Sequence, residues 1–373
     1  MSAPPATSAR SARTAPGSER LVVAMSGGVD SSVAAALAVE TGREVIGVTL
    51  HLAGSRSRCC SLDDADDARR VAERLGLRFY VANYLDAFRK EVIEPFADAY
   101  LRGHTPIPCV PCNSRFKFAL LMERAAVLGA DAVASGHYAR IDRDPASGRR
   151  RLRRAADLRK DQTYFLFELD QAQLERTWFP LGDLTKDAVR ECARALGLRT
   201  AEKPESQEIC FVPDGDYRSV VEQIRPEAAD RPGRFVSEAG RELGRHPGVH
   251  HFTVGQRRGI GVAASRKLYV VDIDPESGDV TLGEEDALAS AGARVERVNW
   301  IAGAPPEAPV RARVRIRYRD PGAPAWVHPD GPGRARVVFD RGARAVCPGQ
   351  AAVFDAAEGD VVLGGGWIAG RVR

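Results

Sequence analysis

The chain has 373 residues, 44% of them hydrophobic and 28% charged, with a formal net charge of +4. This composition is typical of a globular protein, and the length predicts about two or three domains. The mild net charge indicates that a polyanion would be bound by local basic clusters rather than by overall charge.

No stretch approaches the roughly 20 apolar residues of a membrane span, so no membrane partner is expected. Residues 1–20 are rich in Ser, Ala, Pro and Arg and lack the apolar run of a secretory signal. They are predicted to be a disordered tail, with a transit peptide as the alternative. The protein is expected to be cytoplasmic.

Strand-like and helix-like segments alternate in the first part of the chain. Short apolar runs indicate strands at 21–25, 44–50, 77–83 and 131–137. Segments with helical spacing follow at 31–40, 63–76, 87–101 and 115–129. This alternation predicts an α/β domain with a doubly wound parallel sheet.

The pattern changes near residue 200. Residues 201–285 contain Pro, Gly and short strand-like pieces, such as KLYVVDID at 267–274. From about residue 288 onward, short strands are separated by Gly and Pro turns. This second pattern predicts a small β-barrel or sandwich at the C-terminal end.

A glycine-containing loop joins the first predicted strand to the first predicted helix. Its sequence is Ser26-Gly27-Gly28-Val29-Asp30-Ser31-Ser32. Glycines let the backbone approach an anion closely, and a helix N-terminus directs N–H groups and a positive dipole toward it. The loop has neither the Gly-Lys-Ser/Thr of a Walker A motif nor GxGxxG. A turn without a ligand is the alternative, but SGGVDSS resembles the signature of the PP-loop ATP pyrophosphatases.

The seven cysteines are odd in number and widely spread, which argues against a disulfide framework. Cys109 and Cys112 form a CxxC before a helix expected to begin near Arg115, where the thiol pKa should be lowered. The residues alone leave three interpretations open for this CxxC: redox or nucleophilic chemistry, inert core thiols, or a metal or cluster site. That last site could be completed by Cys59, Cys60 or Cys210. Considered singly, Cys210 and Cys192 are typical of packed core residues, and Cys347 has no evident role.

Two basic segments are candidates for binding nucleic acid. Residues 149–160, RRRLRRAADLRK, hold one acid among many basic side chains. A solvated loop is the alternative to RNA phosphate contact here. The second segment places arginines at every other position, which on a strand predicts one arginine face: Arg311, Arg313, Arg315, Arg317 and Arg319. Its alternative is an exposed barrel face.

Nine motifs occur in one order along the chain and together resemble one family. They are SGGVDSSV, RCCSLDDADDARRVAERLG, HTPIPCVPCNSRFKF, SGHYAR, KDQTYFLF, FPLGDLTK, SQEICFVPDGDY, HHFTVGQRRG and CPGQAAVFD. In this order they resemble the bacterial and organellar tRNA-specific 2-thiouridylases, from about residue 21 to the C-terminus.

The resemblance implies three domains: a PP-loop domain at 21–205, similar to adenine nucleotide alpha hydrolases, a small central domain at 206–287, and a C-terminal tRNA-binding β-barrel at 288–373. It also implies ATP-dependent 2-thiolation of uridine 34, the wobble position, by adenylation of the C2 oxygen and sulfur transfer from a cysteine persulfide. ATP and Mg²⁺ would be required. The partners would be the anticodon loop of tRNA and a persulfide donor, such as a cysteine desulfurase or a relay protein.

The resemblance also assigns residues. The reactive thiols, which would end as a disulfide, are Cys112 and Cys210. The ATP contacts are Ala24, Met25, Ser26, Gly27, Gly28, Val29, Asp30, Ser31, Leu50 and Gly136. The target base would meet Arg317 and Tyr318, and other parts of the tRNA would meet His137, Lys160, Asp161, Gln162 and Gln350. No resident metal ligand is assigned.

One departure from the family pattern affects this assignment. The usual Thr-Pro-Asn-Pro stands here as Thr105-Pro106-Ile107-Pro108, which removes an amide from a segment near the target base. Base contact at 107–109 is therefore left unassigned. Cys109 is either a third thiol or a ligand of an iron–sulfur cluster shared with Cys112 and Cys210. The rival functions are an amide synthetase and a tRNA- or nucleotide-binding module without turnover.

Overall fold

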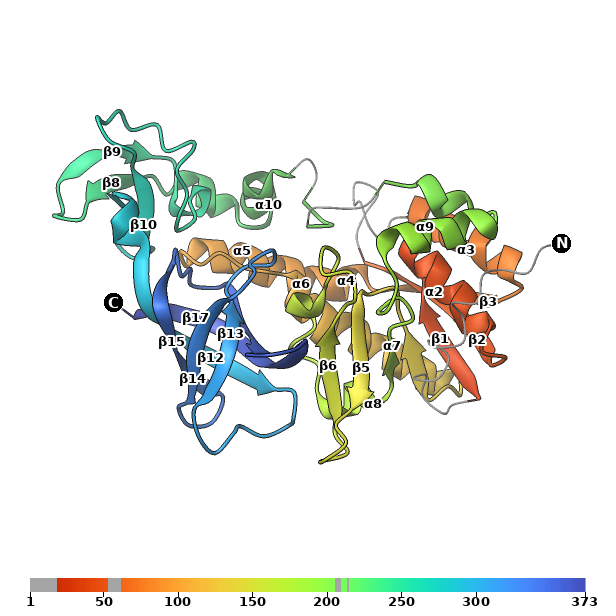
Figure 1. The fold of residues 1–373 in the computed structure, drawn as a ribbon. Helices are drawn as coiled ribbons and strands as arrows, with labels where there is room; N and C mark the ends of the chain where they lie inside the picture. The colour runs from red at the N-terminus through yellow and green to blue at the C-terminus, as the bar shows by residue number, and fades with distance from the viewer. Residues whose placement is uncertain (1–18, 53–61, 205–208, 213–214, 373) are drawn as a thin grey trace.

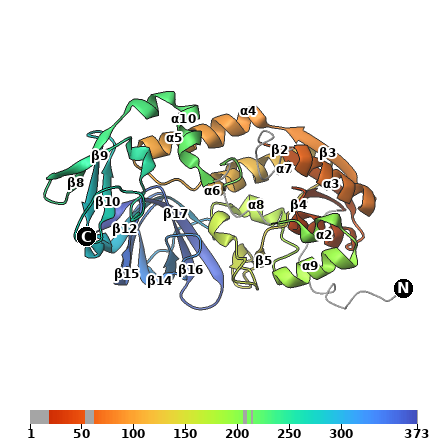
Figure 2. The ribbon, with the colours of Figure 1, turned by 90° about the horizontal axis from the view of Figure 1, so that it is seen from above.

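The computed structural model describes residues 19–52, 62–204, 209–212 and 215–372. Residues 1–18 of the predicted tail at 1–20 lie outside the described residues, as do Cys59 and Cys60. Three parts are visible in Figure 1: a sheet with helices at the right, a small central domain at the upper left and a barrel at the lower left. Seen from above, these parts form an arc (Figure 2). In the described part of the chain, no helix is long and apolar enough to cross a membrane.

The first part is built on a five-stranded parallel sheet in the order β3-β2-β1-β4-β7. The strands are β1 (Arg20–Ala24), β2 (Glu44–His51), β3 (Arg78–Asn83), β4 (Ala132–Ala134) and β7 (Thr177–Trp178). The central strand is buried on both sides, as expected of parallel strands covered by helices. The prediction of a doubly wound sheet is confirmed.

Alternate side chains of β1 pack against helices on opposite faces of the sheet. Leu21 and Val23 share a core with helices α2 (Val29–Val39), α3 (Leu62–Leu75) and α9 (Lys186–Ala195). Val22 belongs to the core on the other face. The period of two along the strand therefore decides which helices cover which side.

Two long helical segments cover that second face. The first comprises α4 (Leu85–Phe88), a π-helical turn η2 (Arg89–Ile93) and α5 (Glu94–Leu101). The second comprises α6 (Cys109–Pro111), the π-helical η3 (Cys112–Lys117) and α7 (Phe118–Val127). The expected helix start near Arg115 is wrong, because the helical segment begins at Cys109. The CxxC thus lies within the helix, at a π-helical turn of the kind often found at functional sites.

Shorter elements follow. The described part contains the hairpin β5 (Ala139–Arg143) and β6 (Arg150–Arg154), helix α8 (Gln171–Glu175) and the 3₁₀ turns η4 (Thr163–Phe165) and η5 (Arg199–Glu202). The β5–β6 hairpin leaves the first domain and adds to the barrel sheet, where β6 pairs with β17.

The central domain carries a four-stranded sheet in the order β10-β11-β8-β9. Its elements are α10 (Tyr217–Ile224), η7 (Pro226–Asp230), β8 (Gly233–Ser237), β9 (Glu242–His246), η8 (Val249–His251), β10 (Tyr269–Asp274), β11 (Asp279–Gly283) and η9 (Glu285–Leu288). The buried side chains of Phe235, Val270 and Leu282 form its core.

The C-terminal part is a closed barrel of six strands in the order β12-β15-β14-β13-β16-β17, with β12 pairing to β17. The strands are β12 (Ala289–Trp300), β13 (Val310–Arg315), β14 (Ala323–Pro329), β15 (Arg334–Arg344), β16 (Ala351–Ala356) and β17 (Val361–Val372). Buried and exposed residues alternate along β15, as in a filled barrel.

The predicted arginine face on one barrel strand is wrong. Strand β13 ends at Arg315, so Arg317 and Arg319 lie in the following turn. Arg315 is only 2% exposed and points into the protein, whereas Arg311 is exposed and bonded to Asp340. The period-two pattern therefore does not continue far enough to make one basic surface.

Candidate active site

The glycine loop lies at the carboxyl end of β1, next to the carboxyl end of β4. Strand order reverses between these two strands, because β2 and β3 lie on one side of β1 and β4 and β7 on the other. In open α/β sheets, ligands bind at this switch point. The topology therefore brings Ser26–Gly28 beside Ser135–His137.

Close backbone contacts require glycine at two places, one in the loop and one in the segment after β4. Gly27 has a φ of +69°, and a Cβ there would overlap the carbonyl group of Asp64. A Cβ on Gly136 would lie 2.7 Å from the carbonyl carbon of Asp30. Gly136 thus lets the chain after β4 pack directly on the loop. The need for this close packing explains why a glycine stands at this predicted site residue.

The N-terminus of α2 is available to an anion. Gly28 is its extended N-cap residue and gives no side-chain cap. The hydroxyl groups of Ser31 and Ser32 both donate to the Gly28 carbonyl, at 3.0 and 2.8 Å, and Ser31 Oγ accepts from Ser26 N. These hydroxyls therefore shape the loop, and the first N–H groups of the helix are the donors that suit a phosphate.

Lys203 places a cation beside the loop, which the sequence analysis did not assign. Its Nζ donates to the Gly27 carbonyl (3.1 Å), to Asp64 (2.8 Å) and to Asp67 (2.7 Å). Burial pulls the pKa of Lys203 down, but hydrogen bonds and charge from the two carboxylates raise it overall. It is therefore charged at neutral pH. Its only sequence signal is its place three residues before Ser206, where the SQEICFVPDGDY motif begins.

Asp30 is held away from the ligand position by two other groups. Lys186 Nζ lies 2.7 and 2.9 Å from its two carboxylate oxygens, and the Tyr138 hydroxyl donates to it at 2.8 Å. Lys186 is 5% exposed. An ATP contact by Asp30 would therefore involve its backbone. Lys186 and Tyr138 stand in the FPLGDLTK and SGHYAR motifs, but neither had been given a role.

The two predicted reactive cysteines border one apolar cluster. Cys112 is 4% exposed and belongs to it, and Cys210 packs against it half-buried. Phe211 contacts Phe88 with a ring-centroid distance of 5.8 Å, and Phe88 contacts Phe116 at 5.6 Å. Phe211 follows Cys210 and Phe116 lies on the Cys112 helix, with Phe88 between the two rings. These ring contacts therefore hold the Cys210 segment against the Cys112 helix.

The same cluster includes other residues assigned to the site. Leu50 is a member, and Ala24, Ile107 and Tyr318 pack against it. The Tyr318 ring lies 4.4 Å from that of Phe165. Its neighbour Arg317 donates to the carbonyl groups of Arg344 and Ala345. The fold thus gathers around one core residues that were predicted to contact ATP, to transfer sulfur and to meet the base.

The segment after α5 rests on a turn of the barrel. Thr105 N donates to the Pro348 carbonyl at 2.9 Å, and Gln350 Nε2 donates to the Thr105 carbonyl at 2.9 Å. Cys347 is buried, with its thiol 3.3 Å from Thr105 Oγ1, and burial raises its pKa. Gln350 therefore positions the 104–108 segment, and Cys347 has a packing role.

Asp161 is part of a buried ionic network between the first domain and the barrel. Its carboxylate accepts from Arg315, Arg154 and Thr163, at 3.1, 3.2 and 2.8 Å. Arg315 also donates to Asp355 at 2.8 Å, and both of these side chains are nearly inaccessible. The expected tRNA contact at Asp161 does not fit this buried carboxylate, which instead joins two domains.

The neighbouring residues of the same motif remain near the surface. Gln162 Oε1 accepts from Tyr138 N at 2.8 Å, which connects the motif to the segment after β4. Lys160 is half-buried.

The basic run at 149–160 is largely neutralised within the protein. Its arginines form ion pairs: Arg150 with Glu175, Arg151 with Asp142, Arg153 with Asp360, Arg154 with Asp161 and Arg159 with Asp157. Most of these lie on β6, a strand, and therefore not in the solvated loop that was the alternative interpretation. The paired arginines do not support the expected role as a phosphate-binding surface.

His137 follows β4 and is neutral at physiological pH. Its Nδ1 lies 2.8 Å from Ser135 Oγ, and its ring packs near Phe118 and Phe179. Burial, with a smaller effect from Lys117, lowers its pKa to about 3. The imidazole can therefore offer hydrogen bonds but no positive charge to a ligand.

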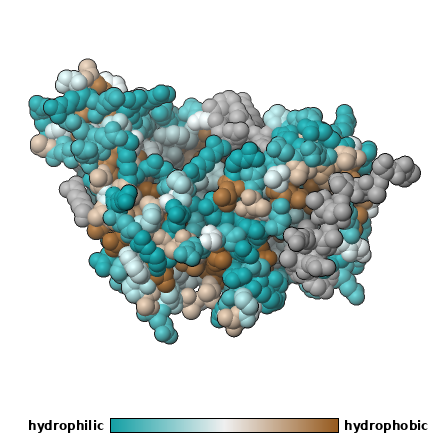
Figure 3. Space-filling model, viewed as in Figure 1, coloured by the Kyte–Doolittle hydropathy of each residue, from teal (hydrophilic) through white to brown (hydrophobic). Residues whose placement is uncertain are grey.

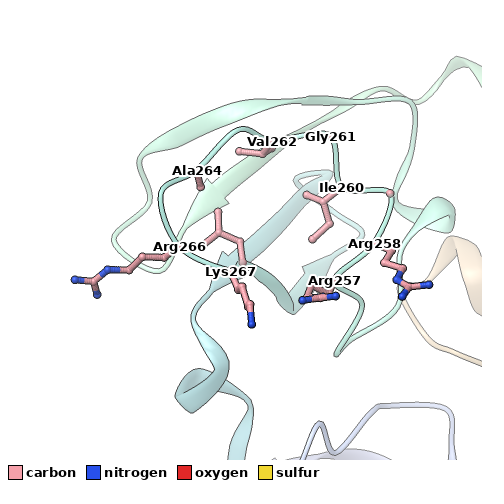
Figure 4. Close-up of a pocket in the computed structure, with 10 residues that line it drawn as sticks. Arg257, Arg258, Ile260, Gly261, Val262, Ala264, Arg266 and Lys267 are labelled. Atoms are coloured by element: carbon pink, nitrogen blue, oxygen red, sulfur yellow. The ribbon is translucent and has the colours of Figure 1, made fainter.

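A separate cationic pocket of about 340 Å³ lies in the central domain, in the loop before β10 (Figure 4). Its charged lining residues are Arg257, Arg258, Arg266 and Lys267. Arg266 pairs with Glu284. On the face drawn in Figure 3 the molecule is mostly hydrophilic, with apolar side chains in small groups.

Family models match the chain in three successive regions. Residues 19–214 match the tRNA methyl transferase HUP domain, 219–284 the tRNA methyl transferase PRC-barrel domain, and 290–368 the aminomethyltransferase beta-barrel domain. The tRNA-specific 2-thiouridylase MnmA of Solibacter usitatus is 52% identical, over 93% of this chain and 98% of its own length. The chain belongs to the tRNA-specific 2-thiouridylase family. Another member, from Paracoccus denitrificans, is 48% identical over 95% of this chain and 93% of its own length.

Two solved structures that match this thiouridylase do so weakly. A 4-thiouridine synthetase in complex with RNA and ATP is 17% identical, with a TM-score of 0.35, over 56% of this chain and 50% of that chain. An NMN synthetase from Francisella tularensis is 20% identical, with a TM-score of 0.34, over 56% of this chain and 78% of that chain. At these scores the similarity is too slight to bear on function.

Proposed function

We propose that this enzyme uses ATP to replace the C2 oxygen of uridine 34 in tRNA with sulfur. The observation that carries the proposal is the single apolar cluster that contains Leu50 and Cys112 and packs against Cys210 and Tyr318. Residues assigned to nucleotide, sulfur and base would meet there, beside the glycine loop. The names of the relatives support tRNA as the substrate and 2-thiolation as the reaction.

The glycine loop would hold the pyrophosphate part of ATP while the C2 oxygen attacks the α-phosphorus. Pyrophosphate leaves, and the oxygen becomes part of an AMP ester that can depart. The α2 N-terminus and Lys203 would stabilise the charge that develops on the leaving phosphates. Mg²⁺ would neutralise further phosphate charge. Asp30 and Asp64 are each bonded to a lysine, so we expect the ion to be carried on the phosphates.

The thiols would then deliver sulfur. A donor protein transfers sulfane sulfur to Cys210, giving Cys210–S–SH. The Cys112 thiolate attacks the Cys210 sulfur, which forms a Cys112–Cys210 disulfide and releases hydrosulfide. Hydrosulfide adds to C2 and AMP leaves, so the base keeps the sulfur. A dithiol reductant must restore both thiols before the next turnover.

Single substitutions test the sulfur step. Cys112→Ala and Cys210→Ala should abolish 2-thiouridine, measured by mass spectrometry of tRNA nucleosides after reaction with ATP and a persulfide source. Both variants should still release pyrophosphate with unmodified tRNA, since ATP activation does not use the thiols. Cys192→Ala is the control, because Cys192 packs on the other face of the sheet. A fully active Cys210→Ala enzyme would refute the assignment.

The same preparations separate the alternatives. An amide synthetase would release pyrophosphate without tRNA, and a binding module would release none. An iron–sulfur cluster on Cys109, Cys112 and Cys210 predicts stoichiometric iron after anaerobic purification, with activity lost when the iron is removed. The persulfide route predicts full activity without iron.

The cationic pocket of the central domain would contact RNA phosphates away from the target base. Replacing Arg257 and Arg258 by Gln should weaken tRNA binding and reduce the slope of log K against log [salt] by up to about two phosphate contacts. Filter binding across salt concentrations measures this. An unchanged slope would exclude these two arginines from the interface.

A further inference from the structure

A cluster of three metal-ligating side chains lies in the central domain, outside the thiolation site. It consists of Glu222, His250 and His251. Glu222 is on α10, and the two histidines are consecutive residues of the 3₁₀ turn η8. The potential ligand atoms all lie within 4.8 Å of one another.

Two distances within the cluster lie at the long end of the hydrogen-bond range and equal those expected between ligands of a tetrahedral metal ion. Glu222 Oε1 lies 3.3 Å from His250 Nε2 and 3.4 Å from His251 Nε2. With Zn–N and Zn–O bonds of about 2.0–2.1 Å, ligands of a tetrahedral zinc ion are about 3.3–3.4 Å apart. Ordinary N–H···O hydrogen bonds are shorter, at about 2.9–3.0 Å. An octahedral ion with bonds of about 2.1 Å would also bring neighbouring ligands closer, to about 3.0 Å.

The burial of the three side chains also suits a metal site. His250 is 1% exposed, His251 20% and Glu222 38%. One side of the cluster is thus enclosed and the other is open, which gives an ion a route in and leaves room for a water molecule as the fourth ligand. A neutral imidazole is the form that binds metal.

We propose that Glu222, His250 and His251 form a binding site for a divalent transition-metal ion, with Zn²⁺ as the ion that fits best. The ion would join α10 to η8. Helix α10 follows the Cys210 segment closely in sequence, and Val220 and Val221 share a core with Val212. The metal would therefore fix the helix on which the Cys210 segment rests. It takes no part in the chemistry proposed for the thiols.

Metal counting on the full chain tests this site. Protein is stripped with a chelator, incubated with Zn²⁺, desalted and analysed by mass spectrometry for bound zinc. Wild-type protein should retain one ion that Glu222→Gln and His251→Gln each lose. His328→Gln is the control, because His328 lies on β14 of the barrel. Near-UV circular dichroism of each variant shows whether it is folded.

Cobalt distinguishes this site from the cysteines. Co²⁺ bound by two imidazoles and a carboxylate should give the d–d bands of a tetrahedral site without thiolate-to-cobalt charge transfer. These bands should disappear in folded His251→Gln and persist in Cys112→Ala. Three results would overturn the proposal: no retained ion in wild type, unchanged zinc in both cluster variants, or a cobalt spectrum dominated by thiolate charge transfer.

Discussion

Replacing Arg315 by Met should destabilise the barrel strongly. Arg315 and its partners Asp161 and Asp355 are all 2–3% exposed in their side chains. Removing one member of such a buried network costs about 3–5 kcal/mol, because the remaining charges stay buried. A folded domain is stable by only about 5–15 kcal/mol, so this single change removes a large share.

The loss should depend on pH and should be repaired by a second change. Asp161 keeps Arg154 and Thr163, but Asp355 loses its main partner. Burial already raises the pKa of Asp355. A carboxyl with a raised folded-state pKa stabilises the fold below its unfolded pKa, and this stability is lost as the pH rises through the folded value. Arg315→Met should therefore cost less in mild acid than at pH 8, and adding Asp355→Asn should recover most of the loss.

Urea unfolding followed by tryptophan fluorescence measures these effects. Trp300, Trp326 and Trp367 lie in the barrel, so the signal reports mainly on this domain. Arg311→Met is the matched control, since its ion pair with Asp340 is exposed and should matter little. Equal unfolding midpoints for the Arg315 and Arg311 variants would refute the reasoning, as would a double variant no more stable than Arg315→Met alone.

Three further predictions concern the first domain. Lys203→Met should raise KM for ATP about tenfold or more while leaving tRNA affinity unchanged, since it removes the cation beside Gly27. Steady-state pyrophosphate release with tRNA measures KM, and Lys203→Arg should recover part of the wild-type value. Gly27→Ala should abolish ATP binding in calorimetry, because its φ is positive and a Cβ would overlap Asp64; normal affinity would contradict that geometry. His137→Phe should make unfolding less sensitive to acid. Because the pKa of His137 is lowered in the folded protein, only the unfolded state takes up a proton as the pH falls below about 6.5. This uptake lowers the free energy of unfolding of the wild type by up to about 2 kcal/mol at pH 5. If urea titrations gave the two proteins the same dependence of unfolding free energy on pH, the prediction would be wrong.

The architecture could be predicted where local pattern and topology agree. The sequence pattern of residues 21–39 is compatible with a single local structure, a strand, a glycine loop and a helix. The loop and its place in the sheet could therefore be predicted from residue types alone. The start of the helix at Cys109 could not be predicted, since Pro108 and Pro111 suggest a loop, although prolines fit a first turn. Likewise, the strand pattern through Arg319 gave no sign that β13 ends at Arg315.

The partners of charged residues were beyond prediction for a different reason. Arg153 of β6 pairs with Asp360, which is more than 200 residues away in the sequence. Lys203 and Lys186 likewise meet carboxylates far along the chain. Charge along a sequence indicates what could bind a polyanion, but only the fold determines which cations are already paired.

The hairpin β5–β6 has a consequence for protein engineering. Its residues belong to the first domain by sequence, yet β6 pairs with β17 and Arg153 holds Asp360. In a chimera whose barrel comes from a relative, the interface between β6 and β17 would therefore combine residues of two proteins unless residues 139–154 were exchanged together with the barrel. Recombinant libraries should tolerate crossovers that move these two pieces together and reject those that part them.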